Sequence, residues 1–300
     1  MRSAGLLATS ALRGRVLTRA ARAGAGALAL GGLLLVAGCG QQVGAPAAAV
    51  PAAAVHPDLS GFWNLDVKIP RDEELMGRIA PNTVFLDDTG PVEFPAGQYG
   101  GLILTPAAVE AARKWSPYDQ LTTENACKPP SIVYSMQGPF PIEIFQSDTL
   151  IVMKLEYYDL VRIVFLDGRQ AEADYPNSKV GFSSGHWEGS TLVVETTHLE
   201  ASTITNNGLD HTDGIRVIER FKLGADGKTL LSTQEFEDPA VIQNRGVRFI
   251  AWRKEAGQHV FPYECDPGFA GNYAPPQGGK APGGKAQGKK AKKGGGASAH

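Results

Sequence analysis

GHWEGSTLVVETTH, residues 185–198, is the stretch that decides the fold of this chain. Two short apolar-rich runs flank the dipeptide Glu188-Gly189, a pattern typical of the tight turn of a β-hairpin. A second clean hairpin signal stands around Ala225-Asp226-Gly227-Lys228, and the turn Asp167-Gly168-Arg169 closes another alternating run. The remaining strands are therefore expected to add to this central hairpin.

Period-two alternation of apolar and polar residues extends over most of the chain after residue 141. The expected strands are Ile142–Gln146, Thr149–Tyr157, Leu160–Leu166, Val180–Trp187, Thr191–His198, Ile215–Leu223, Thr229–Glu237, Gly246–Lys254 and His259–Tyr263, after an opening strand within Asp58–Leu65. Short strand pieces are expected near Thr83–Leu86 and Gly101–Leu104. So many closely spaced strands predict a mainly β fold. We expect an antiparallel up-and-down barrel or a strongly curled sheet, lipocalin-like, because closure removes exposed edges.

One short helix is predicted beside these strands. Thr105 suits the N-cap, Pro106 suits the first helical position, and Ser116-Pro117 ends the helix-forming run Ala107–Trp115. Such a helix is long enough to lie on a sheet or to cover a barrel mouth.

The first 38 residues are typical of an export signal. They contain five arginines and no acid, followed by an apolar run too short to span a membrane comfortably. The run ends in Leu35-Val36-Ala37-Gly38-Cys39, which resembles a bacterial lipobox; an ordinary signal peptide with an incidental cysteine is the alternative. We expect Cys39 to carry lipid, which places the protein in the bacterial cell envelope, anchored to a membrane and facing the periplasm or the exterior. Residues 39–57, rich in Ala and Pro, are expected to be a tether.

The net charge of the whole chain differs from that of its middle, because both ends are basic. Residues 275–300 are rich in Gly, Ala and Lys and are predicted to be disordered, so the folded domain should cover residues 58–274. Of the 29 basic residues, five lie in the signal and six in this tail, leaving 18 against 31 acids, a net charge of −13. A nucleic-acid partner is not expected for an acidic domain. A contact between the Lys-rich tail and anionic envelope material is one hypothesis, and a solvated tail is the other.

Two cysteines remain once Cys39 is assigned to lipid. Disulfides persist in exported proteins, so Cys127 and Cys265 are predicted to be bonded to each other rather than to bind metal or act as nucleophiles.

Several motifs also resemble a family of secreted bacterial proteins of uncharacterised activity. The motifs are an Asp-Leu-Ser-Gly-x-Trp start (Asp58–Trp63), an Asp-Gly-Arg turn (Asp167–Arg169), the Gly185–Thr196 hairpin and a Val-x-Glu-Arg-Phe strand (Val217–Phe221). The resemblance covers roughly residues 58–273 and departs at Ser190, where the family usually has Asp. It implies a lipocalin-like β-domain and export, and no activity.

Candidate ligand contacts follow from the polar and aromatic residues of the predicted strands: Glu156, Arg162, His186, Trp187, Glu188 and His198. A histidine beside a carboxylate can exchange protons near neutral pH, and an inward Glu156–Arg162 pair would orient a polar ligand. The alternatives are structural imidazoles and a surface cross-strand pair. The segment Leu209-Asp210-His211-Thr212-Asp213 could bind a cation through Asp210, His211 and Asp213. It lacks the spacing of a recognised metal loop, so a turn or strand-entry role is expected there and no metal site is predicted.

No nucleophile elbow, zinc-helix motif, phosphate loop or dinucleotide fingerprint is present, and no cofactor is predicted. The first hypothesis is a lipid-anchored β-barrel that binds a small apolar or amphipathic molecule. The second is an envelope hydrolase, lyase or isomerase that uses His186 or His198 with Glu188, Glu195 or Glu156; the sequence does not say which residues would be catalytic. The third is a structural envelope protein that makes its contacts through the Lys-rich tail.

Overall fold

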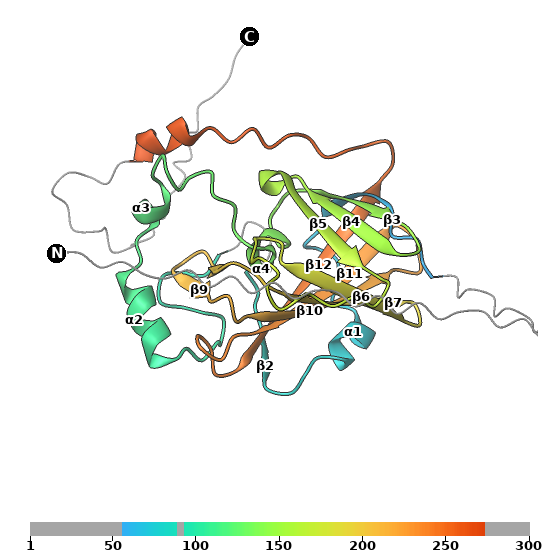
Figure 1. Cartoon of the computed structure of the whole chain (residues 1–300), viewed down its shortest axis with the longest axis horizontal. Coiled ribbons are helices and arrows are strands. Elements are labelled where there is room, and N and C mark those ends of the chain that lie inside the picture. Colours follow the sequence, from blue (N-terminus) through green and yellow to red (C-terminus); the bar gives the residue numbers. More distant parts are fainter. Residues whose placement is uncertain (1–55, 89–92, 274–300) are drawn as a thin grey trace, which may run out of the picture. The chain divides into compact units, whose positions relative to one another are not determined.

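The computed structural model describes residues 56–88 and 93–273 (Figure 1). The predicted signal, the lipidation site Cys39 and the Lys-rich tail lie outside these residues, so their predictions stay predictions.

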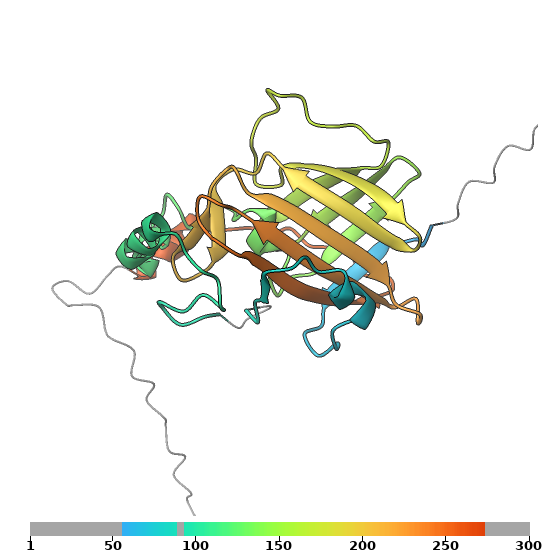
Figure 2. The same cartoon turned by 90° about the horizontal axis from the view of Figure 1, so that it is seen from below.

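Nine strands close into one mixed β-barrel (Figures 1 and 2). In the order of their pairing they are β1 (Gly61–Leu65), β3 (Ile142–Gln146), β4 (Leu150–Leu155), β5 (Leu160–Phe165), β6 (Phe182–Glu188), β7 (Thr191–Thr197), β10 (Arg216–Leu223), β11 (Thr229–Glu237) and β12 (Arg245–Glu255). The barrel closes where β12 pairs with β1, from Phe62 opposite Glu255 to Leu65 opposite Trp252. The predicted barrel is therefore confirmed.

Within the described residues, three further strands lie outside this ring. β2 (Thr83–Phe85) extends the edge of β12 beside β1, and β8 (Ser202–Thr205) pairs with β9 (Leu209–His211) in a separate small hairpin. The predicted hairpin at the centre of the fold is present as β6 and β7, with Glu188 opposite Thr191 across the turn.

Two pairings are parallel, which an up-and-down barrel does not predict. β5 pairs with β6, and β12 pairs with β2. A parallel pair needs a crossover of about a dozen residues or more, and residues 166–181 supply it between β5 and β6.

The segment His259–Tyr263 is not a strand, although its alternation predicts one. Its backbone amides bond to side chains instead, with the Phe261 amide donating to Glu156 and the Tyr263 amide to Asp159. Gly101–Leu104 likewise forms only an isolated bridge between Leu104 and Ile242.

The predicted helix is α2 (Pro106–Lys114), and the Thr105 hydroxyl accepts from the Ala108 amide at 3.3 Å as its cap. Three unpredicted short helices also begin at a side-chain cap, which satisfies an otherwise free amide. They are α1 (Glu73–Gly77) after Asp72, α3 (Pro117–Gln120) after Ser116 and α4 (Ile132–Ser135) after Ser131. 3₁₀ turns cover Tyr157–Asp159 and Pro267–Tyr273. In the described part of the chain, no helix is both long and apolar enough to cross a membrane.

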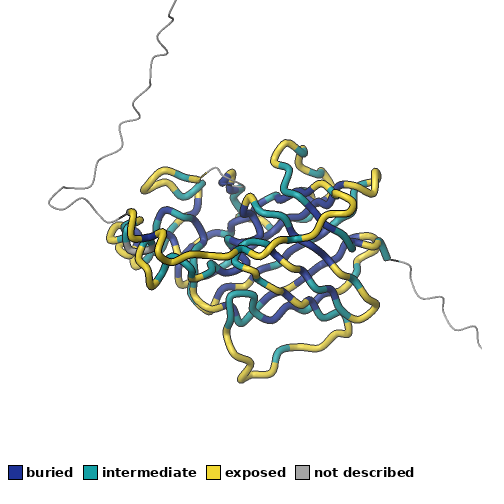
Figure 3. The backbone as a smooth tube through the Cα atoms, turned by 90° about the horizontal axis from the view of Figure 1, so that it is seen from above, coloured by how far each residue is buried: buried dark blue, intermediate teal, exposed yellow. Residues whose placement is uncertain are grey.

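Inward-facing side chains of the barrel strands belong to one large apolar core cluster. Figure 3 shows buried positions recurring along the strands. Trp63, Phe221 and Trp252 are fully buried there, and the Phe221 and Trp252 rings stack with centroids 6.5 Å apart. Large side chains meeting at the centre of a small barrel leave it packed rather than hollow.

A buried ion pair crosses this core. Arg162 on β5 and Glu219 on β10 are each fully buried and bond to each other. The Arg162 guanidinium also donates to Ser183 Oγ at 3.0 Å and to Thr196 Oγ1 at 2.7 Å. Neighbouring strands thus share one polar network inside an apolar core.

A second buried pair fixes α4 against the barrel. Arg248 on β12 donates to both carboxylate oxygens of Asp88, at 2.9 and 2.7 Å, and to the carbonyls of Val133 and Ile204. Gln234 on β11 donates to the Ile132 carbonyl at 3.1 Å. Because the apolar side chains of α4 belong to the same core cluster, α4 acts as a plug held by barrel residues.

Candidate functional site

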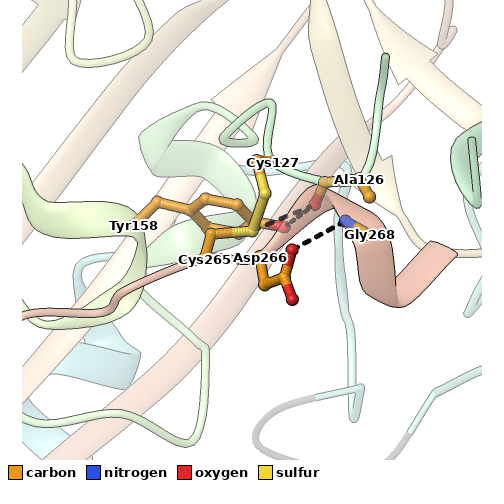
Figure 4. The surroundings of a disulfide bond; sticks show 6 residues. All are labelled: Ala126, Cys127, Tyr158, Cys265, Asp266 and Gly268. Atoms are coloured by element: carbon orange, nitrogen blue, oxygen red, sulfur yellow. Dashed lines mark hydrogen bonds between the residues drawn. A yellow bond between two sulfur atoms is a disulfide. The ribbon is translucent and has the colours of Figure 1, made fainter. Parts of the chain in front are cut away.

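The disulfide between Cys127 and Cys265 joins two segments far apart in the chain, as predicted. It ties the segment before α4 to residues 256–273, which we call the C-terminal strap. Figure 4 shows Tyr158 from the β4–β5 turn beside the two cysteines, and its hydroxyl donates to the Ala126 carbonyl at 2.9 Å. Three separate segments therefore meet at this bond.

Carboxylates from β3 and from the β4–β5 turn hold the C-terminal strap along its length. His259 Nδ1 lies 2.6 Å from Glu143 Oε1, the Phe261 amide donates to Glu156 at 3.0 Å, and the Tyr263 amide donates to Asp159 at 3.1 Å. Backbone amides that bond to carboxylates replace the missing strand ladder, and they fix where Tyr263 lies.

A hollow of about 450 Å³ opens between the strap, the β4–β5 turn and the segment that carries α4. We call it the tyrosine groove, after the aromatic side chains that line it: Tyr134, Tyr157, Tyr158, Tyr263 and Phe269. None of its lining residues belongs to the nine barrel strands. Its volume falls within the range of roughly 300–1,000 Å³ that is typical of small-molecule sites.

The rings of the groove are fixed by contacts with one another. Tyr157 and Tyr263 meet edge to face with centroids 5.5 Å apart, and Tyr158 and Tyr263 lie tilted at 4.6 Å. Phe140 stacks on Tyr157 at 4.8 Å behind them. Edge-to-face and offset contacts favour such pairs beyond the burial of their surface, so the aromatic wall is formed before any ligand arrives.

The tyrosines of the groove are neutral phenols. Burial raises the pKa of Tyr134 far above its ordinary value, and its hydrogen bond to Glu93 raises it further. Burial followed by the neighbouring tyrosines raises the pKa of both Tyr157 and Tyr158. Each hydroxyl therefore keeps its proton at physiological pH and offers both a donor and an acceptor.

Polar side chains complete the lining opposite the rings. They are Asn125, Lys128, Lys179, Ser202, Thr203, Asn206 and Asp210. Asn206 is held by Glu93, to which its amide donates at 2.9 Å. The groove thus joins an apolar wall to hydroxyl, amide and ammonium groups, the composition of a site for an amphipathic ligand.

The structure does not bring together the six residues proposed as ligand contacts. Glu156 holds the strap, while Arg162 is buried against Glu219 and faces the barrel core. Glu156 and Arg162 therefore make no pair. Neither lines the tyrosine groove, although Glu156 adjoins Tyr157, which does.

His186, Trp187 and Glu188 divide between the two faces of β6. Trp187 packs against the core cluster and its ring stacks on His56 with centroids 4.8 Å apart. His186 and Glu188 point outward, where His186 Nε2 lies 3.1 Å from Glu188 Oε1 and Arg78 also pairs with Glu188. This His/carboxylate pair is largely in water, with the two side chains 65% and 46% exposed.

His198 follows the end of β7 rather than continuing its inward row. Its φ of 56° turns the chain after Thr197, so the imidazole does not follow Leu192 and Val194 into the core. His198 Nδ1 lies 2.9 Å from Thr197 Oγ1, and the ring meets Tyr175 edge to face.

A second hollow, of about 330 Å³, lies on the outer wall beside His186. Its other walls include Phe182, Glu195 and Arg220 from β6, β7 and β10, together with Gln170 from the crossover. It is smaller than the tyrosine groove and has one phenylalanine as its aromatic lining.

The segment Asp210–Asp213 forms the end of the β8–β9 hairpin rather than a ligand set. His211 is buried, with Nε2 2.7 Å from Ser131 Oγ and Nδ1 2.7 Å from the Thr212 carbonyl. Burial lowers the pKa of His211, which makes it a neutral structural imidazole beside the cap of α4. Within residues 56–88 and 93–273, no group of three or more His, Cys, Asp or Glu side chains is placed to hold a metal ion.

No protein-family model matches this chain, and a search of curated proteins finds no match.

Sequence patterns missed most of the groove. Its residues come from the β4–β5 turn, the segment around α4, the β8–β9 hairpin and the strap, which share no periodicity. One signal did exist: the predicted Cys127–Cys265 bond places Tyr263 close to the segment that contains Asn125 and Ala126.

Proposed function

We propose that the protein is a lipid-anchored component of the bacterial cell envelope that binds a small amphipathic molecule in the tyrosine groove. The one observation that carries this proposal is the convergence of four tyrosines, from three separate segments, on a single hollow of about 450 Å³. Ordinary core packing does not need four phenols at the surface end of a barrel, since buried tyrosines are used where an apolar ring must also present a polar tip.

The filled core is the reason for placing the ligand outside the barrel. Trp63, Phe221, Trp252 and the Arg162–Glu219 pair occupy the space that a lipocalin-like binder would leave open. Displacing a buried ion pair for a guest would expose unpaired charges to an apolar interior, which is strongly unfavourable. The groove needs no such rearrangement.

Localisation in the cell envelope is supported by sequence features outside the described residues. These are the basic and apolar leader, the lipobox-like Leu35–Cys39 and the resemblance to a secreted family. The disulfide agrees with an oxidising compartment. We expect the exported protein to incorporate labelled palmitate, and Cys39→Ser to abolish the label; incorporation that survives this change would contradict lipidation at Cys39.

Native mass spectrometry of protein purified from envelopes tests the binding function. We expect a co-purifying small molecule that is lost in Tyr263→Ala, because this change removes the ring at the centre of the aromatic wall. Tyr175→Ala is the matched control, since Tyr175 packs on Phe182 and His198 away from the groove. A bound molecule retained by Tyr263→Ala, or lost equally in Tyr175→Ala, would contradict the assignment to this groove.

A further inference from the structure

More ammonium groups than carboxylates line the tyrosine groove, whereas the domain around it is acidic. Two ammonium groups, Lys128 and Lys179, line it with one carboxylate, Asp210. The domain carries 31 acids against 18 basic residues. Glu93, Glu124 and Glu200 each contact a lining residue, so the groove as a whole is not positive. The attraction for an anionic ligand comes from the two ammonium groups themselves, which can pair with it directly.

Both ammonium groups are within reach of a ligand because their present carboxylate partners are weak. Lys179 lies 3.2 Å from Glu200, whose side chain is 58% exposed, and it also donates to the Ala201 carbonyl at 3.1 Å. Lys128 lies 3.7 Å from the exposed Glu124 and donates to Asn125 Oδ1. Pairs with an exposed glutamate contribute little to stability, so a ligand anion can take the place of the glutamate.

The aromatic side chains of the groove favour a ligand that contains a saturated ring over an acyclic ligand. The face of a phenol ring carries partial negative charge and attracts the partly positive C–H groups of a saturated ring laid over it. Tyr157, Tyr158 and Tyr263 hold one another in place, so little conformational freedom is lost when such a ring binds. Asn206, Ser202 and Thr203 then face the hydroxyl rim of that ring.

We propose that the ligand of the tyrosine groove is an anionic saccharide, a sugar ring that carries a carboxylate or a phosphate. This inference rests on the proposed binding function and adds the ligand class. The sugar lies on the tyrosines, its hydroxyls bond to the amide and hydroxyl side chains, and its anionic group pairs with Lys179 and Lys128.

Isothermal titration calorimetry on the full exported chain tests the class with four probes. Trigalacturonate supplies the carboxylate arm, galactose 1-phosphate supplies the phosphate arm, and galactotriose and galactose are their neutral counterparts. We expect one anionic probe to bind at least about ten-fold more tightly than its neutral counterpart, with an affinity that falls as salt is raised.

Two lysine variants separate the groove from the rest of the surface. Lys179→Met is expected to weaken the binding of the anionic probe about ten-fold and to leave the affinity for the neutral probe unchanged. Lys154→Met is the control, because Lys154 lies on the outer wall over the Phe145 ring and does not line the groove. Anion binding that Lys179→Met does not weaken, or equal binding of charged and neutral sugars, would overturn the proposal.

The remaining outcomes distinguish the proposed ligand class from the proposed binding function. If no sugar binds but envelope-purified protein still carries a molecule that Tyr263→Ala removes, the ligand class is wrong and the binding function stands. If neither a sugar nor a co-purifying molecule is found, both are wrong.

Discussion

The inside of the barrel and the tyrosine groove at its plugged end are built on opposite plans. The inside is made mainly of strand side chains, with Ile132 and Val133 of α4 in the same core cluster, and it is closed to water. The Arg162–Glu219 ion pair crosses it, and the Arg248–Asp88 pair is buried beside α4. The groove is made of turns, short helices and the C-terminal strap, and it lies open to water. The inside holds large buried side chains such as Trp63, Phe221 and Trp252, whereas the groove has polar and aromatic groups facing a hollow.

This difference teaches where a barrel without a hollow centre can carry a site. Regular strands bury their inward side chains against one another, which leaves the irregular connections to supply a concave surface. Connections are mobile unless they are tied down, and here the disulfide and the carboxylates under the strap tie them. The strands supply stability and the connections supply the site.

The largest effect is expected from breaking the ion pair inside the barrel. Glu219→Gln leaves Arg162 buried without its carboxylate, and removing one partner of a buried pair costs about 3–5 kcal/mol. The free energy of unfolding from denaturant titration measures this loss. The double change Arg162→Met with Glu219→Leu should cost less, since it leaves no unpaired charge. A loss of unfolding free energy below about 1 kcal/mol for Glu219→Gln would show that this ion pair is not important for the stability of the barrel interior.

Removing the disulfide should act on the groove while sparing the barrel. Cys127→Ser with Cys265→Ser opens a loop with a sequence separation of 138. We expect the free energy of unfolding to fall by about 2–5 kcal/mol. Because the strap would lose its anchor beside Tyr263, limited proteolysis should cut it first. The β-sheet circular dichroism should persist, and a strap as resistant as in the parent protein would show that the carboxylates alone hold it.

An intermediate effect is expected from His211, which lies between the two regions beside the cap of α4. Its pKa is lowered by burial, so the unfolded chain binds a proton more readily than the folded one. Stability is therefore full above the unfolded pKa of about 6.5 and falls as the pH drops from there toward the lower folded pKa. His211→Gln should flatten this dependence between pH 8 and 5, as measured by denaturant titration. An equal slope in both proteins would assign the pH dependence to other groups.

The smallest effect is expected on the outer wall. His186→Gln should change the free energy of unfolding by less than about 0.5 kcal/mol, because exposed pairs contribute little. The same change should leave the molecule bound in the groove untouched, as read by native mass spectrometry. A larger loss of stability, or a lost ligand, would mean that the outer wall takes part in the function.

The sequence predicted where the strands lie better than it predicted which strands pair with each other. Glu188-Gly189 and Ala225–Lys228 marked two hairpins, since turn chemistry and period-two alternation are local properties that single residues reveal. The parallel β5–β6 pair was missed, because a parallel pair is decided by the path of a long crossover and not by the strands themselves. The strap was mistaken for a strand, because its alternation is the same whether its amides meet backbone carbonyls or carboxylates.

The sequence did not reveal where the proposed ligand contacts lie relative to one another, for a related reason. Arg162 was proposed as a ligand contact from its residue type, yet Glu219, Ser183 and Thr196 use its donors inside the core. Which face of a strand is buried is decided by the strands on either side of it, and one alternating run cannot reveal that.

The sequence by itself predicted a mainly β fold rich in hairpins, a barrel or a strongly curled sheet, together with a Cys127–Cys265 bond, because alternation, turn residues and cysteine count act locally or by simple exclusion. Only the tertiary structure decided that the centre is filled and that Tyr134, Tyr158 and Tyr263 meet at one end of the barrel. The physical reason is distance along the chain: packing and the disulfide join residues that no period or spacing connects.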